Sequence, residues 1–189
     1  MLFRNGNTTY MPKVQYYCAS TLDGYIAEAD DTLDWLTQYQ PVRRYDAPED
    51  APMPGSYERF YEDVGALVSG SATYEFVLGE LEGGLDWPYR GKPCWILTSH
   101  DLPIVEGDGV DIRLVSDTVR ELLDDMMRSA DGKNLWVVGG GNVASQFADE
   151  GLLDEVIVTI VPVVLGNGKR LFDRRLPGRR PRGAARWPP

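Results

Sequence analysis

The segment Leu135-Trp136-Val137-Val138-Gly139-Gly140-Gly141-Asn142-Val143-Ala144 contains a short apolar run, three consecutive glycines and the start of an amphipathic stretch. This order predicts a buried strand that turns directly into a helix. Glycines let backbone amides approach a pyrophosphate, and a helix N-terminus offers unpaired N–H groups with a favourable dipole. The alternative is a tight turn that needs a positive φ, for which one glycine suffices. The pattern is not G-x-G-x-x-G and lacks the later acid, so an ordinary Rossmann dehydrogenase fits poorly.

Two other predicted strands also end in small or hydroxyl residues. They are Val68-Ser69-Gly70-Ser71-Ala72-Thr73-Tyr74-Glu75 and Ile96-Leu97-Thr98-Ser99-His100. Each is a weak signal by itself, because serine and threonine at helix starts are commonly caps; Ser71 or Thr73 would cap the helix that follows. Ligands of open α/β sheets bind at the carboxyl ends of the strands. Together with the glycines, these segments predict a long groove.

Strands and helices alternate along the rest of the chain. We expect strands at 14–20, 25–27, 66–69, 94–98, 112–115, 135–138 and 155–165, and helices at 33–39, 57–63, 73–81, 118–128 and 142–150. Four prolines mark residues 40–55 as a loop, and Pro162 suits an edge strand or a bulge. The pattern predicts an α/β fold in three layers, with a mostly parallel central sheet and helices on both faces.

Charge is distributed unevenly along the 189 residues. From Lys169 onward there are eight basic residues and one acidic residue, against eleven basic and twenty-eight acidic residues before it. The acidic segment before Lys169 would repel a polyanion, which disfavours nucleic acid as a partner. Residues 177–189 are interpreted as a basic, Pro- and Arg-rich tail, and residues 1–12 as a disordered extension, leaving one domain at 13–176.

Other function classes are disfavoured by what the sequence contains. Cys18 and Cys94 lie in apolar runs and are interpreted as core residues, and one histidine argues against a histidine-based metal site or a Ser–His–Asp triad. No stretch approaches the roughly 20 apolar residues of a membrane span, and no signal core precedes the domain. We therefore expect a cytoplasmic protein without metal or membrane contacts.

The ordered series of motifs resembles the dihydrofolate-reductase-like family, in the bacterial branch that contains the riboflavin-biosynthesis reductase domain. The motifs are Ser20-Thr21-Leu22-Asp23-Gly24-Tyr25-Ile26-Ala27, Gly70-x-x-Thr73-Tyr74-Glu75, Gly139-Gly140-Gly141, and Leu153-Asp154-Glu155 with Pro162-x-x-Leu165-Gly166-x-Gly168. The resemblance covers roughly residues 13–172. It implies an NADPH-dependent reductase that acts on a pteridine- or pyrimidine-like heterocycle or a related small metabolite.

The resemblance also implies roles for individual residues. Ala19 and Ile26 would hold the nicotinamide, and a cis peptide would join Gly139 to Gly140. The phosphates and the adenosine would contact Gly70, Ser71, Ala72, Thr73, Thr98, Ser99, His100, Gly139, Gly140, Gly141, Asn142 and Val143. The substrate would contact Asp23, Trp35, Tyr74 and Thr159.

Three departures from the family pattern qualify this expectation. Ser71 stands where the family usually has an arginine for the 2′-phosphate, so NADH is the alternative cofactor. No carboxylate follows Trp35 before residue 41, which leaves Asp34 as the candidate catalytic acid, although an acid in a helix's first turn is also ordinary. The last strand of the family's sheet is missing or altered after Leu176, and the resulting open edge favours a homodimer.

Alternative interpretations exist for the role of the aromatic residues and, separately, for the function of the whole chain. Tyr57, Tyr61, Tyr74 and the Trp87-Pro88-Tyr89 segment are interpreted as packing rather than substrate stacking. A non-catalytic nucleotide-binding protein that retains the fold is the alternative to a reductase.

Overall fold

The computed structural model describes residues 11–37 and 57–176. The predicted loop at 40–55 and the tail at 177–189 lie outside these residues, as do residues 1–10 of the predicted extension. The described elements, in chain order, are β1 (Val14–Thr21), β2 (Tyr25–Ala27), α1 (Asp34–Thr37), α2 (Tyr57–Glu62), β3 (Val64–Gly70), α3 (Ser71–Glu82), β4 (Pro93–Leu97), β5 (Asp111–Val115), α4 (Val119–Ser129), β6 (Asn134–Gly139), α5 (Gly141–Asp149), β7 (Glu155–Val161) and β8 (Lys169–Arg170).

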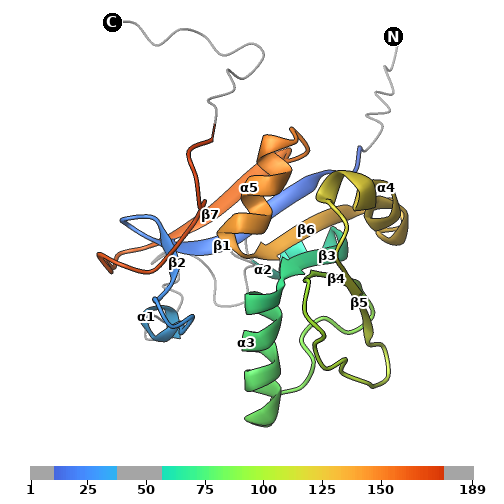
Figure 1. The fold of residues 1–189 in the computed structure, drawn as a ribbon, viewed down its shortest axis with the longest axis horizontal. Helices are drawn as coiled ribbons and strands as arrows, with labels where there is room; N and C mark the ends of the chain where they lie inside the picture. Colours follow the sequence, from blue (N-terminus) through green and yellow to red (C-terminus); the bar gives the residue numbers. More distant parts are fainter. Residues whose placement is uncertain (1–10, 38–56, 177–189) are drawn as a thin grey trace, which may run out of the picture.

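Six strands form one parallel sheet in the order β5-β4-β3-β6-β1-β7 (Figure 1). The sheet order brings the ends of β4, β3 and β6 side by side, with Gly70 opposite Leu97 and Ser69 opposite Gly139. Because all six strands run the same way, their carboxyl ends meet at one edge of the sheet. The α/β prediction with a mostly parallel sheet is confirmed.

Apolar side chains cover both faces of the sheet. Val119, Met126 and Phe147 of α4 and α5 pack on one face, and Tyr74 and Val77 of α3 pack on the other. The central strands β3 and β6 are therefore apolar along almost their whole length, as expected for strands buried on both sides. This gives the three-layer arrangement visible in Figure 1.

Strand β7 lies at an edge of the sheet, as Pro162 predicted, and ends one residue before that proline. Among the described residues no strand pairs with its outer side, and the Val156 and Ile160 side chains are exposed. The chain after β7 instead returns as β8 and pairs antiparallel with β2 in a small separate sheet, which the sequence did not predict.

Within the described residues, no helix is long and apolar enough to cross a membrane.

Candidate functional site

A groove of about 680 Å³ lies where the carboxyl ends of β1, β3 and β6 meet the helix starts. It is open to solvent at the surface and is lined mostly by apolar side chains. The predicted residues that line it are Ala19, Ile26, Ala72, Thr73, Gly139, Gly140, Gly141, Asn142 and Thr159. The structure therefore brings together residues from five separate parts of the sequence.

The glycine turn between β6 and α5 forms part of the groove wall. Gly140 has φ 87° and ψ 102°, a conformation that an L-amino acid rarely adopts, and it precedes the first residue of α5. A Cβ added at Gly139 would lie 2.8 Å from Thr73 Oγ1, so α3 packs directly against this turn. The peptide bond between Gly139 and Gly140 is trans, so the cis bond implied by the family resemblance is wrong; the positive φ of Gly140 makes the turn instead.

The turn between β3 and α3 faces the glycine turn. A Cβ added at Gly70 would lie 3.3 Å from Cγ2 of Val143 on α5, which shows how close the two helix starts are. Helix α3 begins at Ser71 after Gly70, and no side chain of the described residues caps its first turn. The prediction that Ser71 or Thr73 caps α3 is therefore wrong, because the helix starts earlier and Thr73 lies against Gly139. The starts of α3 and α5 thus lie close together, and neither has a side-chain cap among the described residues.

The segment after β4 lies outside the groove. Thr98 Oγ1 accepts a hydrogen bond of 3.0 Å from the His100 backbone N–H, which closes a local turn. Ser99 and His100 are exposed, and none of residues 98–100 lines the groove. Their strand nevertheless ends beside Gly70, so they continue the same edge of the sheet.

Aromatic side chains also line the groove and form what we call the aromatic wall. Tyr17, Tyr57, Tyr89 and Trp136 all line it, and the Tyr57 and Trp136 ring centroids are 5.8 Å apart. Trp136 Nε1 donates a 3.0 Å hydrogen bond to the Tyr17 carbonyl oxygen, which holds the indole in place. Burial raises the pKa of Tyr57, so its hydroxyl stays protonated and can donate a hydrogen bond. The interpretation of Tyr57 and Tyr89 as packing residues did not predict that they line the groove.

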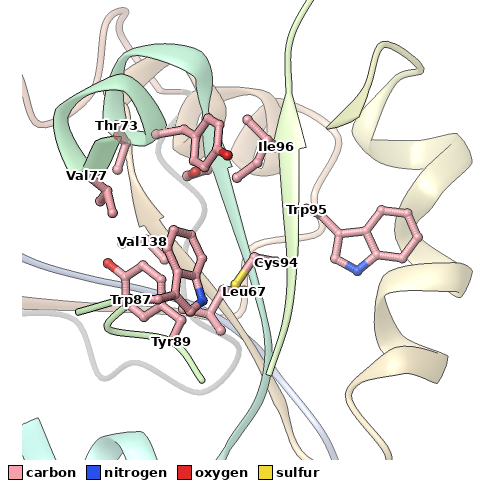
Figure 2. Close-up of a pocket in the computed structure, with 11 residues that line it drawn as sticks. Leu67, Thr73, Val77, Trp87, Tyr89, Cys94, Trp95, Ile96 and Val138 are labelled. Atoms are coloured by element: carbon pink, nitrogen blue, oxygen red, sulfur yellow. The ribbon is translucent and has the colours of Figure 1, made fainter. Parts of the chain in front are cut away.

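Beneath this aromatic wall, the core between α3 and the sheet is almost closed, with a cavity of only about 10 Å³ (Figure 2). Trp87, Tyr89, Cys94 and Val77 surround the cavity, whereas the Trp95 side chain points to the other side of the sheet, where it donates to Ser129. Burial raises the pKa of the Cys94 thiol to about 12, so the thiol stays protonated. Cys94 is therefore a core residue.

Tyr74 belongs to the same core. Its ring is 1% exposed, and its hydroxyl donates to the Pro103 carbonyl oxygen. The resemblance placed Tyr74 at the substrate, whereas the structure places it in the core beneath the groove.

The charged side chains that line the groove are Asp31, Lys169, Arg170 and Asp173. Three of them come from β8 and the residues after it, where the sequence changes from acidic to basic. Sequence reasoning assigned no role to these residues, although that change in charge was the available signal. The pairing of β8 with β2 brings them to the groove.

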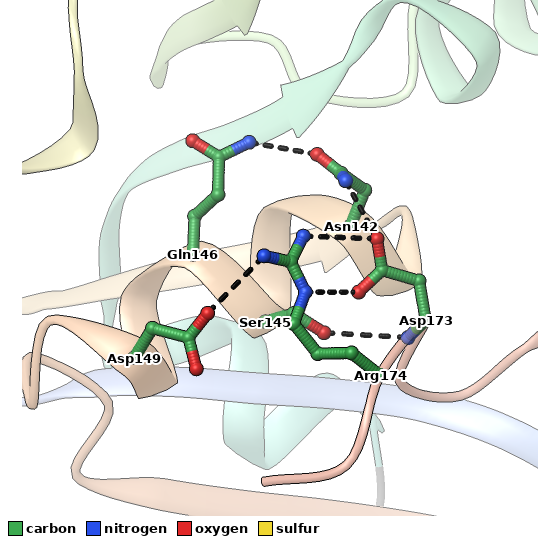
Figure 3. Close-up of polar contacts among 6 residues, drawn as sticks. All are labelled: Asn142, Ser145, Gln146, Asp149, Asp173 and Arg174. Atoms are coloured by element: carbon green, nitrogen blue, oxygen red, sulfur yellow. Dashed lines mark hydrogen bonds and ion pairs between the residues drawn. The ribbon is translucent and has the colours of Figure 1, made fainter.

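A polar network fastens the chain after β8 to α5 (Figure 3). The Asp173 carboxylate accepts hydrogen bonds from the Arg174 guanidinium and from Asn142 Nδ2, the latter at 2.6 Å. Arg174 also contacts Asp149, and the Asp173 backbone N–H donates to Ser145 Oγ. The Arg174 guanidinium is the main cause of the lowered pKa of Asp173. Asp173 is therefore a charged carboxylate at neutral pH, held by its neighbours.

The remaining predicted residues lie away from the groove lining. Asp34, the candidate catalytic acid, is exposed at the first residue of α1, and Trp35 is only 2% exposed. Asp23 accepts hydrogen bonds from Thr21 Oγ1 at 2.6 Å and from the Gly166 N–H at 2.7 Å. Asp23 thus holds the loop before β8 in place through a hydrogen bond from the Gly166 N–H. Gly70, Ser71 and Val143 contribute to the helix starts but do not line the groove itself.

Within the described residues, no group of three or more His, Cys, Asp or Glu side chains could hold a metal ion.

Known proteins are similar to this chain in both sequence and fold. The RibD C-terminal domain family matches residues 90–179. YwjB of Bacillus subtilis (strain 168), an uncharacterised protein, is 29% identical over 160 residues, which span 85% of this chain and 82% of that protein.

Solved structures show a similar fold. A protein of Shewanella sp. PV-4, assigned provisionally to riboflavin biosynthesis, is 28% identical with a TM-score of 0.67, over 86% of this chain and 84% of that one. RibD of Acinetobacter baumannii shares the fold at 19% identity, with a TM-score of 0.52 over 90% of this chain and 51% of that one.

Proposed function

We propose that this chain is a reductase that uses a reduced nicotinamide dinucleotide, because its sequence and fold are similar to those of the dihydrofolate-reductase-like family, in the branch of the RibD C-terminal domain. Its substrate is a pteridine- or pyrimidine-like heterocycle or a related small metabolite. The observation that carries the proposal is the groove itself, in which two uncapped helix starts and three glycines face an aromatic wall.

The residues present fit a dinucleotide at the glycine turn. Helix N-termini and glycine backbones bind phosphates through N–H groups, and neither α3 nor α5 satisfies these groups with a side chain of the described residues. A Cβ at Gly139 would meet Thr73, so the turn is already as close to α3 as a glycine allows. The backbone N–H groups of residues 140–143 would hold the pyrophosphate, and those of residues 70–73 would contact the phosphates at the start of α3.

The aromatic wall fits a planar substrate ring. Rings such as those of Tyr57 and Tyr17 can stack on a planar heterocycle, and the protonated Tyr57 hydroxyl can donate to one of its oxygen atoms. Ala19 and Ile26 line the same groove, where a nicotinamide would meet the substrate.

The bound dinucleotide supplies the hydride, and the protein binds, orients and excludes water around the reacting groups. Asp34 is exposed and outside the groove lining, so a bound water, rather than this carboxyl, would donate the proton to the substrate.

A titration with NADPH and, separately, with NADH tests the proposal. Trp136 lines the groove, so dinucleotide binding should quench tryptophan fluorescence with a saturable dependence on concentration. A second measurement follows the oxidation of the bound dinucleotide with reduced or oxidised pterins and with aminopyrimidines as substrates. Adenosine alone, which lacks the pyrophosphate, serves as the control ligand.

The outcomes separate the two functions that the sequence leaves open. Saturable binding with oxidation by a heterocycle supports the reductase. Binding without oxidation by any heterocycle supports a non-catalytic nucleotide-binding protein. No binding of either dinucleotide would rule out both.

A further inference from the structure

One of the four charged side chains in the groove has no oppositely charged partner among the described residues. Lys169 Nζ lies 3.0 Å from Asp31 Oδ2, and Asp173 is held by Arg174 and Asn142. Arg170 forms no ion pair within the described chain; its guanidinium carbon lies 5.5 Å from the centroid of the Tyr25 ring. The Arg170 charge is therefore available to a ligand in the groove.

The backbone of Arg170 is fixed against the glycine turn. A Cβ added at Gly141 would collide with the Arg170 carbonyl oxygen, so the first residue of α5 packs on this backbone. Arg170 pairs with Tyr25 across the β2–β8 ladder, and the next residue, Leu171, donates a 2.9 Å hydrogen bond to the Gly24 carbonyl oxygen. The arginine is thus positioned by contacts on both sides and not by a partner for its charge.

Arg170 combines a backbone fixed at the start of α5 with a guanidinium that has no oppositely charged partner among the described residues, and this combination suits a phosphate group at that helix start. Arginine binds phosphate oxygens through two parallel N–H groups, and the α5 dipole attracts the same negative charge. The glycines permit close approach of the backbone on the other side. Arg170 and the glycine turn both line the groove, and α5 begins at this turn.

The end of the predicted binding region at which the resemblance places the 2′-phosphate, at the start of α3 and after β4, lacks such a charge. Residues 69–75 and 97–103 contain no lysine or arginine, and they include the exposed acids Glu75 and Asp101. Ser71 offers only a hydroxyl there. A 2′-phosphate at this end would meet two carboxylates and the single histidine, His100.

We propose that Arg170 binds the pyrophosphate of the dinucleotide at the glycine turn, so that binding relies on a group common to NADH and NADPH and does not require the 2′-phosphate. This inference rests on the proposed function. Arg170 is a cofactor-positioning residue in this role, and the 2′-phosphate contributes little to affinity.

The test compares wild type with Arg170→Gln and Arg170→Lys by calorimetric titration of NADH, NADPH and inorganic pyrophosphate. Hydrogen bonds to charged groups are worth about 1.5–3 kcal/mol, so Arg170→Gln should weaken both dinucleotides by about tenfold or more, and by the same factor. Pyrophosphate should weaken in parallel. Arg170→Lys keeps the charge without the planar fork and should lose less.

Two control variants separate a local contact from a general charge effect. Arg175→Gln removes the same charge from an exposed residue outside the groove lining and should leave all three affinities within twofold of wild type. Ser71→Arg adds a cation where the resemblance places the 2′-phosphate contact and should strengthen NADPH more than NADH. Circular dichroism of each variant verifies the fold.

The results distinguish failure of the proposed function from failure of the role proposed for Arg170. If wild type binds neither dinucleotide nor pyrophosphate, the proposed function fails. If wild type binds and Arg170→Gln leaves affinity unchanged, or weakens NADPH alone, the role of Arg170 at the pyrophosphate is overturned. A weakening by Arg175→Gln equal to that by Arg170→Gln would also overturn it.

Discussion

Helices α4 and α5 begin in contrasting ways, although both run along the same face of the sheet. Thr118 caps α4 and accepts a hydrogen bond from the Glu121 N–H, while the Glu121 carboxylate accepts one from the Thr118 N–H. This reciprocal arrangement satisfies two N–H groups of the first turn. Helix α5 follows Gly140 and has no side-chain cap among the described residues.

The difference follows the position of the groove. The start of α4 lies outside the groove lining and satisfies its N–H groups internally, whereas the starts of α3 and α5 border the groove and have no side-chain cap among the described residues. Uncapped starts reduce helix stability in the free protein. We infer that the starts of α3 and α5 lack this stabilisation because their N–H groups serve to bind phosphate.

Replacing Gly140 by alanine should have the largest effect on this contrast. The added Cβ meets no atom closer than 3.7 Å, but the residue holds φ 87°, which is strained for alanine. We expect a loss of about 1–3 kcal/mol in unfolding free energy, and weaker dinucleotide binding because the turn must shift. Urea denaturation and fluorescence titration measure the two effects.

The matched control is Gly79→Ala in α3, where no atom lies within 4 Å of the added Cβ and φ is not positive. This variant should gain about 0.4–1 kcal/mol through the unfolded state and bind dinucleotide normally. Equal behaviour of the two variants would show that the glycine turn has no special conformation.

Replacing Thr118 by alanine should have a smaller effect, confined to stability. Loss of the cap leaves N–H groups of α4 without their partner and should cost about 1 kcal/mol in thermal or urea unfolding. Dinucleotide affinity should not change, because α4 begins outside the groove lining. Ser116→Ala, at an exposed position just before the cap, is the control. A drop in dinucleotide affinity as large as that of Gly140→Ala would contradict the contrast between the two helices.

Replacing Asp173 by asparagine should have the smallest effect, and one that depends on pH. The pKa of Asp173 is lowered in the folded protein, mainly by Arg174, below an unfolded value of about 3.9. The carboxylate therefore stabilises the fold above about pH 4, and this contribution is lost as pH falls through the folded pKa.

Urea unfolding of wild type and Asp173→Asn between pH 7 and pH 3 measures this linkage. The difference in unfolding free energy should stay constant from pH 7 to pH 5 and shrink below about pH 4. A difference that grows on acidification would mean that Asp173 is not held as a carboxylate by Arg174.

Much of the fold follows from local sequence. Apolar runs such as Ala66–Ser69 and the amphipathic spacing of 118–128 predicted β3 and α4 within two residues, because burial on two faces and on one stripe leave distinct patterns. The start of α3 was predicted two residues late. Glycine at the N-cap gives no side-chain signal, so the serine and threonine after it were taken for caps.

The site was predicted in part. Gly139, Gly140, Gly141 and Thr73 line the groove, because short motifs at strand ends carry their own signal. Ala19 and Ile26, which were placed by resemblance, line it as well. Asp34 and Tyr74 were placed at the site by resemblance, and the structure puts one at the exposed start of α1 and the other in the core. Position in a motif does not specify which way a side chain points.

The sequence by itself determined the parallel α/β sheet, the edge position of β7 and the glycine turn, since each depends on the periodicity or backbone freedom of adjacent residues. Only the tertiary structure decided which charges reach the groove. Arg170 lies about thirty residues beyond the glycine turn in the sequence, and pairing of β8 with β2 brings it there. Such long-range pairing depends on contacts between distant segments, which leave no periodic signal in either segment alone.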